Sequence, residues 1–165
     1  MHTETGTDLQ KAADLLLAGE LVAIPTETVY GLAANGLNEE AVLKIYAAKN
    51  RPRFNPLILH VETLEKAAAL VNDVPEEARK LAAAFWPGPL TILLPKSNLV
   101  PDLITAGSNR VALRVPNHPL TLQLLGKINV PLAAPSANPS GYVSPTTAAN
   151  VDSCLKGKIT YIHNL

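Results

Sequence analysis

Short segments with helical spacing alternate along the chain with short segments typical of strands, and prolines stand at their ends. Residues 8–17 place apolar side chains at helical intervals, and residues 20–25 form a short run typical of a buried strand. Proline cannot donate to a sheet ladder or a helix interior, so the 14 prolines mark where elements end. The alternation predicts an α/β fold built on a central sheet.

The same pattern predicts further elements. Expected helices cover residues 39–49, 63–71, 75–85, 119–125 and 146–155, and expected strands cover residues 56–61, 90–94, 110–115, 131–134 and 159–162. Asn38 is a predicted N-cap, because Glu39 and Glu40 follow in the first turn, where the helix dipole favours negative charge. No clear helix joins the strands at 90–94 and 110–115, so we expect a mixed sheet flanked by helices.

Length and composition limit the class of protein. The chain has 165 residues, which suit one domain with a real core, and its 47% of hydrophobic residues argues against disorder. No apolar run approaches the roughly 20 residues that span a bilayer, and the N-terminus lacks the basic and apolar regions of a secretory signal. Cys154 is the only cysteine, which excludes an internal disulfide framework and a cysteine-based zinc site. We therefore expect a single domain over residues 1–165, cytoplasmic and without a membrane partner.

Several common nucleotide-binding and hydrolase motifs are absent from the sequence. There is no GxxxxGK[ST] phosphate loop, no GxGxxG dinucleotide fingerprint and no GxSxG nucleophile elbow. The four histidines show no metal-ligand spacing; they are His2, His60, His118 and His163. These absences remove the commonest kinase, dehydrogenase and hydrolase interpretations.

The formal net charge is zero, but the charges are distributed unevenly. Residues 41–61 contain four basic residues and residues 103–151 contain three, and neither window contains an aspartate or a glutamate. If the two windows meet in the fold, they form a cationic surface without carboxylates, suited to a polyanion such as a nucleotide or RNA. The alternative is that these side chains are scattered and solvated.

The first segment with candidate functional groups is Pro25–Leu32, which places two hydroxyls, a carboxylate and a phenol after a predicted strand. Polar groups at a strand end commonly line a ligand crevice in open sheets. Thr26, Thr28 and Tyr30 are therefore candidate site residues. The alternative is a polar turn with Tyr30 packed inward.

The second segment is Lys49–Pro56, a proline-stiffened loop at a helix end. Lys49 supplies a point charge and Arg51 a planar fork, a combination suited to a triphosphate. Cations at a helix C-terminus also complement the helix dipole, which explains Lys49 without a ligand but explains Arg51 and Arg53 less easily.

The third segment is Ala133–Gly141, followed by Ser144–Thr147. Its small residues allow the backbone to approach a ligand closely, and Ser136 and Asn138 add a hydroxyl and an amide. A turn rich in serine, proline and asparagine is the alternative for this segment taken alone.

Together these segments resemble the YrdC-like family. The sequences PTETVYGL, the KxRP turn followed by NPLILHV, FWPGPLT, RVALRVPNHP and APSANPSG occur in the order and spacing of that family. The match covers about residues 9–149, and the combination is specific although each motif alone is weak. The resemblance implies a twisted mixed α/β sheet of the YrdC/RibB-like kind with a positively charged cavity.

The resemblance also implies a threonylcarbamoyl-AMP synthase domain, which is a nucleotidyltransferase. That reaction joins L-threonine, bicarbonate or carbon dioxide, and ATP into L-threonylcarbamoyladenylate and releases pyrophosphate. A separate threonylcarbamoyl-transfer complex then modifies an adenosine of tRNA. Residue by residue, the family's catalytic elements fall on Lys49, Arg51, Ser136 and Asn138; its ATP positions fall on Arg51, Asn55, Arg110, Ser136 and Ser144; and its threonine positions fall on Thr28, His60, Arg114 and the Ala134 backbone.

Such chemistry needs alignment and relief of phosphate charge more than it needs a general base. We expect Lys49 and Arg51 to stabilise the phosphates and Arg114 to bind the threonine carboxylate as a fork. Ser136 and Asn138 are expected to orient the nucleotide and the carbamate.

Magnesium is expected to arrive on ATP rather than to be held by the protein. Magnesium sites usually use phosphates and waters with one or two carboxylates, and the two basic windows contain none. Glu27 is the one nearby protein candidate.

The resemblance weakens at the C-terminal end. His163 and Asn164 stand where relatives often have aspartate and glycine, and the family continues into a strand that closes the cavity. We therefore expect the end of the family domain to be missing, together with the second domain that longer relatives carry on a linker.

Two other functions stay open on the sequence. One is a non-catalytic RNA-binding module that uses the positive surface, and the other is a relative that forms a carbamoyl adenylate for a different acceptor. Aromatic residues make up only 4% of the chain, and no strand carries the paired aromatics of a base-stacking platform. This weighs against RNA as the primary ligand and leaves tRNA as a candidate partner.

Overall fold

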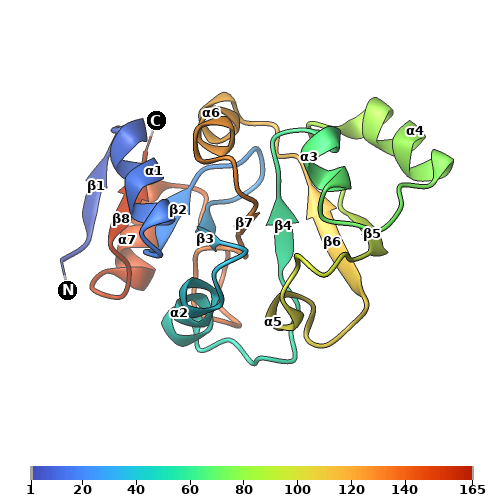
Figure 1. The fold of residues 1–165 in the computed structure, drawn as a ribbon. Coiled ribbons are helices and arrows are strands. Elements are labelled where there is room, and N and C mark those ends of the chain that lie inside the picture. Colours follow the sequence, from blue (N-terminus) through green and yellow to red (C-terminus); the bar gives the residue numbers. More distant parts are fainter. Residues whose placement is uncertain (1, 165) are drawn as a thin grey trace.

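The computed structural model describes residues 2–164, whose strands form one mixed eight-stranded sheet flanked by helices (Figure 1). The strands are β1 (Glu4–Gly6), β2 (Val22–Ile24), β3 (Gly31–Asn35), β4 (Ile58–His60), β5 (Ile92–Pro95), β6 (Arg110–Arg114), β7 (Leu132–Ala133) and β8 (Tyr161–His163). The helices are α1 (Leu9–Leu17), α2 (Glu39–Lys49), α3 (Leu64–Ala68), α4 (Glu76–Phe85), α5 (Asp102–Thr105), α6 (Pro119–Ile128) and α7 (Ala148–Leu155). Across residues 2–164, no helix is both long and apolar enough to cross a membrane.

The strands follow the order β1-β8-β2-β3-β7-β4-β6-β5. β8 pairs in parallel with β1 and β2, and β4 pairs in parallel with β6. The β2–β3, β3–β7, β4–β7 and β5–β6 pairs are antiparallel. The predicted mixed α/β architecture is therefore confirmed. Because most neighbours in the sheet are not consecutive in sequence, the loops that carry the candidate residues come from several parts of the chain.

Apolar side chains cover both faces of the sheet. Successive residues of a strand point to opposite faces, and β2 follows this rule: Ala23 joins a buried cluster with α2, whereas Val22 and Ile24 join another with α1 and α6. Helices α1 and α6 lie side by side over the second cluster (Figure 1). Two packed faces make the sheet a firm base for the loops at its ends.

Four helices begin at side-chain caps. Asp8, Asn38, Thr63 and Thr147 each accept a hydrogen bond from the backbone N–H three residues later. Each cap satisfies an N–H that has no partner inside the helix, and such a cap is typically worth about 1 kcal/mol. The predicted N-cap at Asn38 is confirmed, and its helix ends at Lys49 as predicted.

The sequence pattern does not predict β1, β3 or α5. The sequence of β3 is GLAAN, which has no β-branched or aromatic residue and therefore a low strand propensity. Antiparallel pairing with β2 and β7 makes this segment a strand. β1 has three residues and α5 has four, too few for a periodicity to appear. The helix expected over 63–71 is shorter in the structure, where α3 covers Leu64–Ala68.

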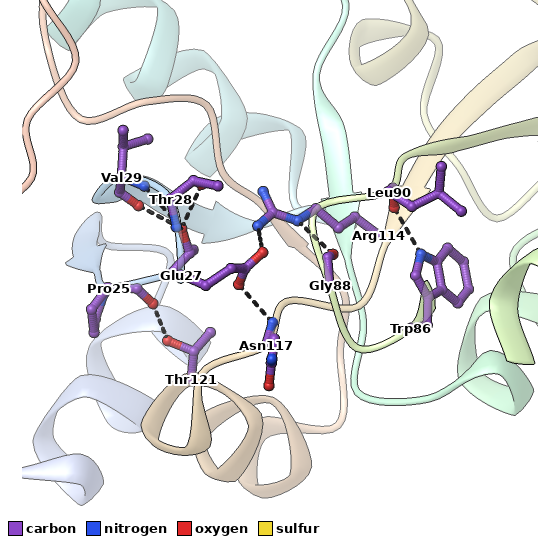
Figure 2. Close-up of polar contacts among 11 residues, drawn as sticks. Pro25, Glu27, Thr28, Val29, Trp86, Gly88, Leu90, Arg114, Asn117 and Thr121 are labelled. Carbon is purple, nitrogen blue, oxygen red and sulfur yellow. Dashed lines mark hydrogen bonds and ion pairs between the residues drawn. The ribbon is translucent and has the colours of Figure 1, made fainter. Parts of the chain in front are cut away.

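Helix α6 holds one of the candidate site segments by a buried hydrogen bond. Thr121 is fully buried, and its Oγ1 donates to the Pro25 carbonyl over 2.5 Å (Figure 2). Pro25 is itself buried and directly follows β2. The bond therefore fixes the point at which the chain leaves the sheet and enters the segment 25–32.

Replacing Thr121 by valine keeps the shape of the side chain and removes the hydroxyl that serves the buried Pro25 carbonyl. We expect the free energy of unfolding, measured by urea denaturation, to fall by about 1–3 kcal/mol. Thr91→Val changes an exposed threonine and serves as the control, with an expected change below about 0.5 kcal/mol. Equal stability of the Thr121→Val variant and the wild type would contradict this role.

Candidate active site

The basic segment and the segment rich in hydroxyls and amides meet at Lys49. This residue ends α2, and Asn50 follows in the left-handed region with φ of 51°, which turns the chain away from the helix. The Lys49 Nζ donates to the carbonyls of Ser136 and Asn138, the latter over 2.5 Å. In return, the Lys49 carbonyl accepts from the Ser140 N–H at 2.8 Å. The two basic windows, residues 41–61 and 103–151, therefore meet at Lys49, as the expected cationic surface requires.

The charged ammonium group of Lys49 is buried. Lys49 is 1% exposed. Burial, followed by the nearby charge of Arg51, lowers the pKa of Lys49 to about 8. A buried ammonium needs acceptors, which the two carbonyls supply, and its third N–H remains for a further acceptor. Lys49 is therefore both a tie between two loops and a positive charge with a pKa near neutrality.

Arg51 lies near Lys49, but its side chain bonds to the loop that follows it. Its Nη2 donates to the Pro56 carbonyl at 2.8 Å, and its Nε makes a longer bond of 3.4 Å to the Asn55 carbonyl. The Asn55 carbonyl also accepts from the Tyr46 hydroxyl at 3.0 Å. These bonds bring Arg51 and Asn55, two of the predicted ATP-binding residues, next to each other.

His60 and Arg114, two of the predicted threonine-binding residues, are brought together by β4 and β6. They are register partners at the ends of these adjacent parallel strands. His60 is 2% exposed, and burial, assisted by the charge of Arg114, lowers its pKa to about 4. The imidazole is therefore neutral at pH 7. Among the described residues its Nδ1 finds no hydrogen-bond partner, and a buried nitrogen of this kind costs free energy until something satisfies it.

Glu27 enters this part of the site from the segment after β2 and pairs with Arg114 (Figure 2). Its Oε1 accepts from the Arg114 Nη2, and its Oε2 accepts from the Asn117 N–H at 2.7 Å. The Arg114 Nε donates to the Gly88 carbonyl at 3.1 Å. The expectation of a surface without carboxylates is wrong at Arg114, because Glu27 comes from outside the two windows on which it was based.

The Glu27 carboxylate is ionised. Burial alone would raise the pKa of Glu27, but hydrogen bonds from backbone N–H groups and the pairing with Arg114 bring the pKa below its ordinary value. Both carboxylate oxygens have partners. Within the part of the chain that the structure describes, no three histidine, cysteine, aspartate or glutamate side chains are grouped so as to hold a metal ion.

A single hydroxyl folds the loop that carries Glu27. The Thr26 Oγ1 donates to the Val29 carbonyl at 2.6 Å and accepts from the Thr28 N–H at 3.2 Å. The two threonine hydroxyls are 3.0 Å apart. Thr28 is exposed, so its predicted contact with threonine is sterically open, whereas Thr26 serves the loop itself.

Tyr30 packs inward, as the structural alternative for this segment expects. It is 6% exposed, and its hydroxyl donates to the Asn164 Oδ1 at 3.1 Å. Its backbone carbonyl accepts from the Ala137 N–H at 2.8 Å, and its N–H donates to the Pro145 carbonyl at 2.8 Å. The backbone of Tyr30 therefore joins the first candidate segment to the third.

The third segment is held partly by its own polar groups. Asn138 is 3% exposed, and its Nδ2 donates to the carbonyls of Pro139 and Tyr142 at 2.7 and 2.9 Å. Ser136 is partly buried and forms an isolated bridge with Gly31. The Asn138 amide N–H groups thus stabilise the loop, and the loop in turn supplies the two carbonyls that bind Lys49.

Three further predicted residues lie around these contacts. Ala134 is buried directly after β7, and Ser144 is exposed in the loop beyond Gly141. Arg110 is exposed at the start of β6 and Arg114 ends it, so the two are separated by roughly 13 Å of extended strand. Arg110 and Arg114 therefore serve different ends of β6.

Sequence reasoning missed the part that the FWPGP turn plays. The Trp86 Nε1 donates to the Leu90 carbonyl at 2.7 Å and closes the turn that carries Gly88 (Figure 2). A Cβ at Gly88 would lie 2.3 Å from the Phe85 carbonyl oxygen, so the turn requires glycine. The tryptophan, prolines and glycine of this segment signal a turn. Nothing in the sequence indicates that the Gly88 carbonyl faces Arg114.

Comparison with known proteins gives one consistent family. The family Sua5_yciO_yrdC, described as "Telomere recombination", matches residues 14–164. A threonylcarbamoyl-AMP synthase of Pyrococcus abyssi is 52% identical over 92% of this chain and 44% of that protein. One of Pseudomonas fluorescens is 37% identical over 93% of this chain and 83% of that protein. The crystal structure of P. abyssi Sua5 complexed with L-threonine matches with a TM-score of 0.93 at 47% identity, covering 98% of this chain and 49% of that one.

The chain thus spans less than half the length of the Pyrococcus relative and most of the length of the Pseudomonas relative. The family match includes all three candidate segments, together with β4, β6 and the FWPGP turn. On the matched residues, the fold and these comparisons, the chain belongs to the Sua5/YciO/YrdC family.

Proposed function

We propose that this chain carries the threonylcarbamoyl-AMP synthase activity for which its relatives are named. The observation that carries the proposal is the meeting of two segments at Lys49, which holds a cation against a loop of small and polar residues. His60 and Arg114 form a second group of the kind that binds an amino acid. The P. abyssi relative complexed with L-threonine supports an amino-acid site in this fold.

On the threonine side, Arg114 is the proposed partner of the substrate carboxylate. Two of its five N–H groups are used by Gly88 and Glu27, which leaves donors for a carboxylate. The neutral His60 and the exposed Thr28 hydroxyl supply uncharged polar contacts, and the Ala134 backbone supplies another. Neutral contacts suit the hydroxyl and amine of threonine, because a second charged group would favour a different ligand.

On the ATP side, Lys49 and Arg51 are the proposed partners of the phosphates. The Lys49 Nζ bonds to two carbonyls among the described residues, and a phosphate oxygen is the proposed acceptor of its third N–H. Arg51, Asn55 and Ser136 are proposed to complete this group, because Ser136 bonds to Lys49 and Arg51 bonds to Asn55. Ser144 and Arg110 are proposed to contact outer parts of the nucleotide. Magnesium enters as the magnesium complex of ATP, since the Glu27 oxygens are already bonded and the phosphates themselves are good magnesium ligands.

The reaction follows in two steps. The threonine amine attacks carbon dioxide and loses a proton, which gives a carbamate. When bicarbonate is the carbon source, a C–O bond to its hydroxyl breaks as the N–C bond forms, and that oxygen leaves as water. A carbamate oxygen then attacks the α-phosphorus of ATP, the bond to the bridging oxygen breaks, and pyrophosphate leaves with that electron pair. The site's task is to align these groups and offset charge on the phosphates, and preorganised cations do this without rearrangement.

The product of this reaction is a reactive mixed anhydride. A separate complex is the proposed recipient, which would transfer the threonylcarbamoyl group to an adenosine of tRNA. Small substrates alone explain the candidate site, so direct contact between this chain and tRNA is not part of the proposal.

Pyrophosphate release from ATP, measured with and without L-threonine and bicarbonate, tests the proposed activity. We expect release that requires both, and a rate lower by about tenfold to a thousandfold in Lys49→Met, because one preorganised charge is lost. Lys44→Met is the matched control: Lys44 lies on the same helix but pairs with Glu20 at 3.1 Å. If the wild-type chain releases no pyrophosphate in response to threonine, the proposed function is wrong.

The pKa of Lys49 predicts how ATP binding depends on pH. Lys49 is charged below a pKa of about 8 and loses its charge as the pH rises through that value. We expect the affinity for magnesium–ATP, measured by calorimetry without threonine, to weaken by about tenfold between about pH 7 and pH 9.5, as for the loss of one charge-assisted hydrogen bond. Lys49→Met has no charge to lose, so its weaker affinity should lack this decline. A constant wild-type affinity over this range would contradict the contact.

A further inference from the structure

Glu27 is the carboxylate that the fold brings to a site otherwise rich in cations. It reaches Arg114 from a segment 87 residues earlier in the chain. The side chains of Arg114 and Glu27 are 11% and 21% exposed, so the pair is partly shielded from water although the Glu27 backbone is exposed. The other two candidate side chains, Lys49 and His60, have no carboxylate as a bonded partner. The pairing is therefore specific to Arg114.

The contacts of Glu27 fix three segments relative to one another. Its Oε1 bonds to Arg114 on β6, and its Oε2 bonds to the Asn117 N–H at 2.7 Å, just before α6 (Figure 2). Its own loop leaves β2 at Pro25, where Thr121 of α6 donates at 2.5 Å. Both oxygens of the Glu27 carboxylate thus have bonded partners. The loop that carries Glu27 is also held at its start, by the bond from Thr121 to Pro25.

The orientation of Arg114 follows from these contacts. Its guanidinium is held on one side by the Gly88 carbonyl at 3.1 Å and on another by Glu27. A guanidinium is planar, so two fixed contacts define the plane and direct the remaining N–H groups. Without the bond to Glu27, Arg114 would keep its charge, but the plane of its guanidinium would no longer be fixed. A bidentate bond to a carboxylate depends on that planar alignment.

We propose that Glu27 is a positioning residue, which holds the Arg114 guanidinium in the plane that receives the carboxylate of the amino-acid substrate. This inference rests on the proposed function, because it takes Arg114 as the carboxylate partner. It assigns to the glutamate of PTETVYGL a role in amino-acid affinity, exerted through Arg114, and no role in ATP affinity. Its negative charge also offsets that of Arg114, so that the site favours a zwitterion over a free anion.

The test is calorimetric binding of L-threonine and, separately, of magnesium–ATP to the full chain and its variants. We expect Glu27→Ala to weaken L-threonine binding by about tenfold, the value of one charge-assisted hydrogen bond, and to leave ATP binding unchanged. Glu27→Gln keeps an acceptor oxygen of the same reach and should recover part of the loss. Glu20→Ala is the matched control, since Glu20 also forms an ion pair, with Lys44 at 3.1 Å, but lies before β2.

A double-mutant cycle with Arg114→Lys separates positioning through Arg114 from an independent effect. Lysine has no plane to align, so adding Glu27→Ala to Arg114→Lys should change the threonine affinity by less than about twofold. Additive losses, equal loss of ATP binding, or unchanged threonine binding in Glu27→Ala would each overturn the inference. Failure of the wild-type chain to bind L-threonine would instead overturn the proposed function on which it rests.

Discussion

The candidate site depends on one buried charge. The Lys49 ammonium lies at the end of α2 and is bonded to two backbone carbonyls of the segment 136–138. A charge that leaves water must be solvated by something else, and here the protein's own peptide dipoles do so. The same two bonds fix a loop of small residues against the helix end. Loss of Lys49 would therefore remove a charge and release a loop together.

The fold treats the partly buried Arg114 differently. Arg114 is paired with a carboxylate and a carbonyl, so its charge is largely offset, whereas Lys49 is bonded to neutral groups and keeps its charge uncompensated. The two environments suit two ligands. An uncompensated cation attracts polyanionic phosphates, and a compensated, planar guanidinium suits the carboxylate of a neutral zwitterion. The proposed reaction, which joins an amino acid to ATP, would use both environments.

Much of the fold around Lys49 was predictable, because local sequence signals determine it. The helix that ends at Lys49 has an N-cap, an acidic first turn and a following proline, and its limits are as predicted. The partners of the charged groups were not predictable in the same way. The bond of Lys49 is to backbone carbonyls, which carry no residue identity, and the Glu27–Arg114 pair joins segments that no local pattern relates. The strand β3 was missed for the same reason, because pairing and not propensity forms it.

The most direct measurement is a crystal structure of this chain with L-threonine and a non-hydrolysable ATP analogue. We expect a phosphate oxygen within hydrogen-bond distance of the Lys49 Nζ, and the threonine carboxylate on the free edge of Arg114. Phosphates bound away from the junction of Lys49 with residues 136–138 would contradict it, whatever the fold or the family.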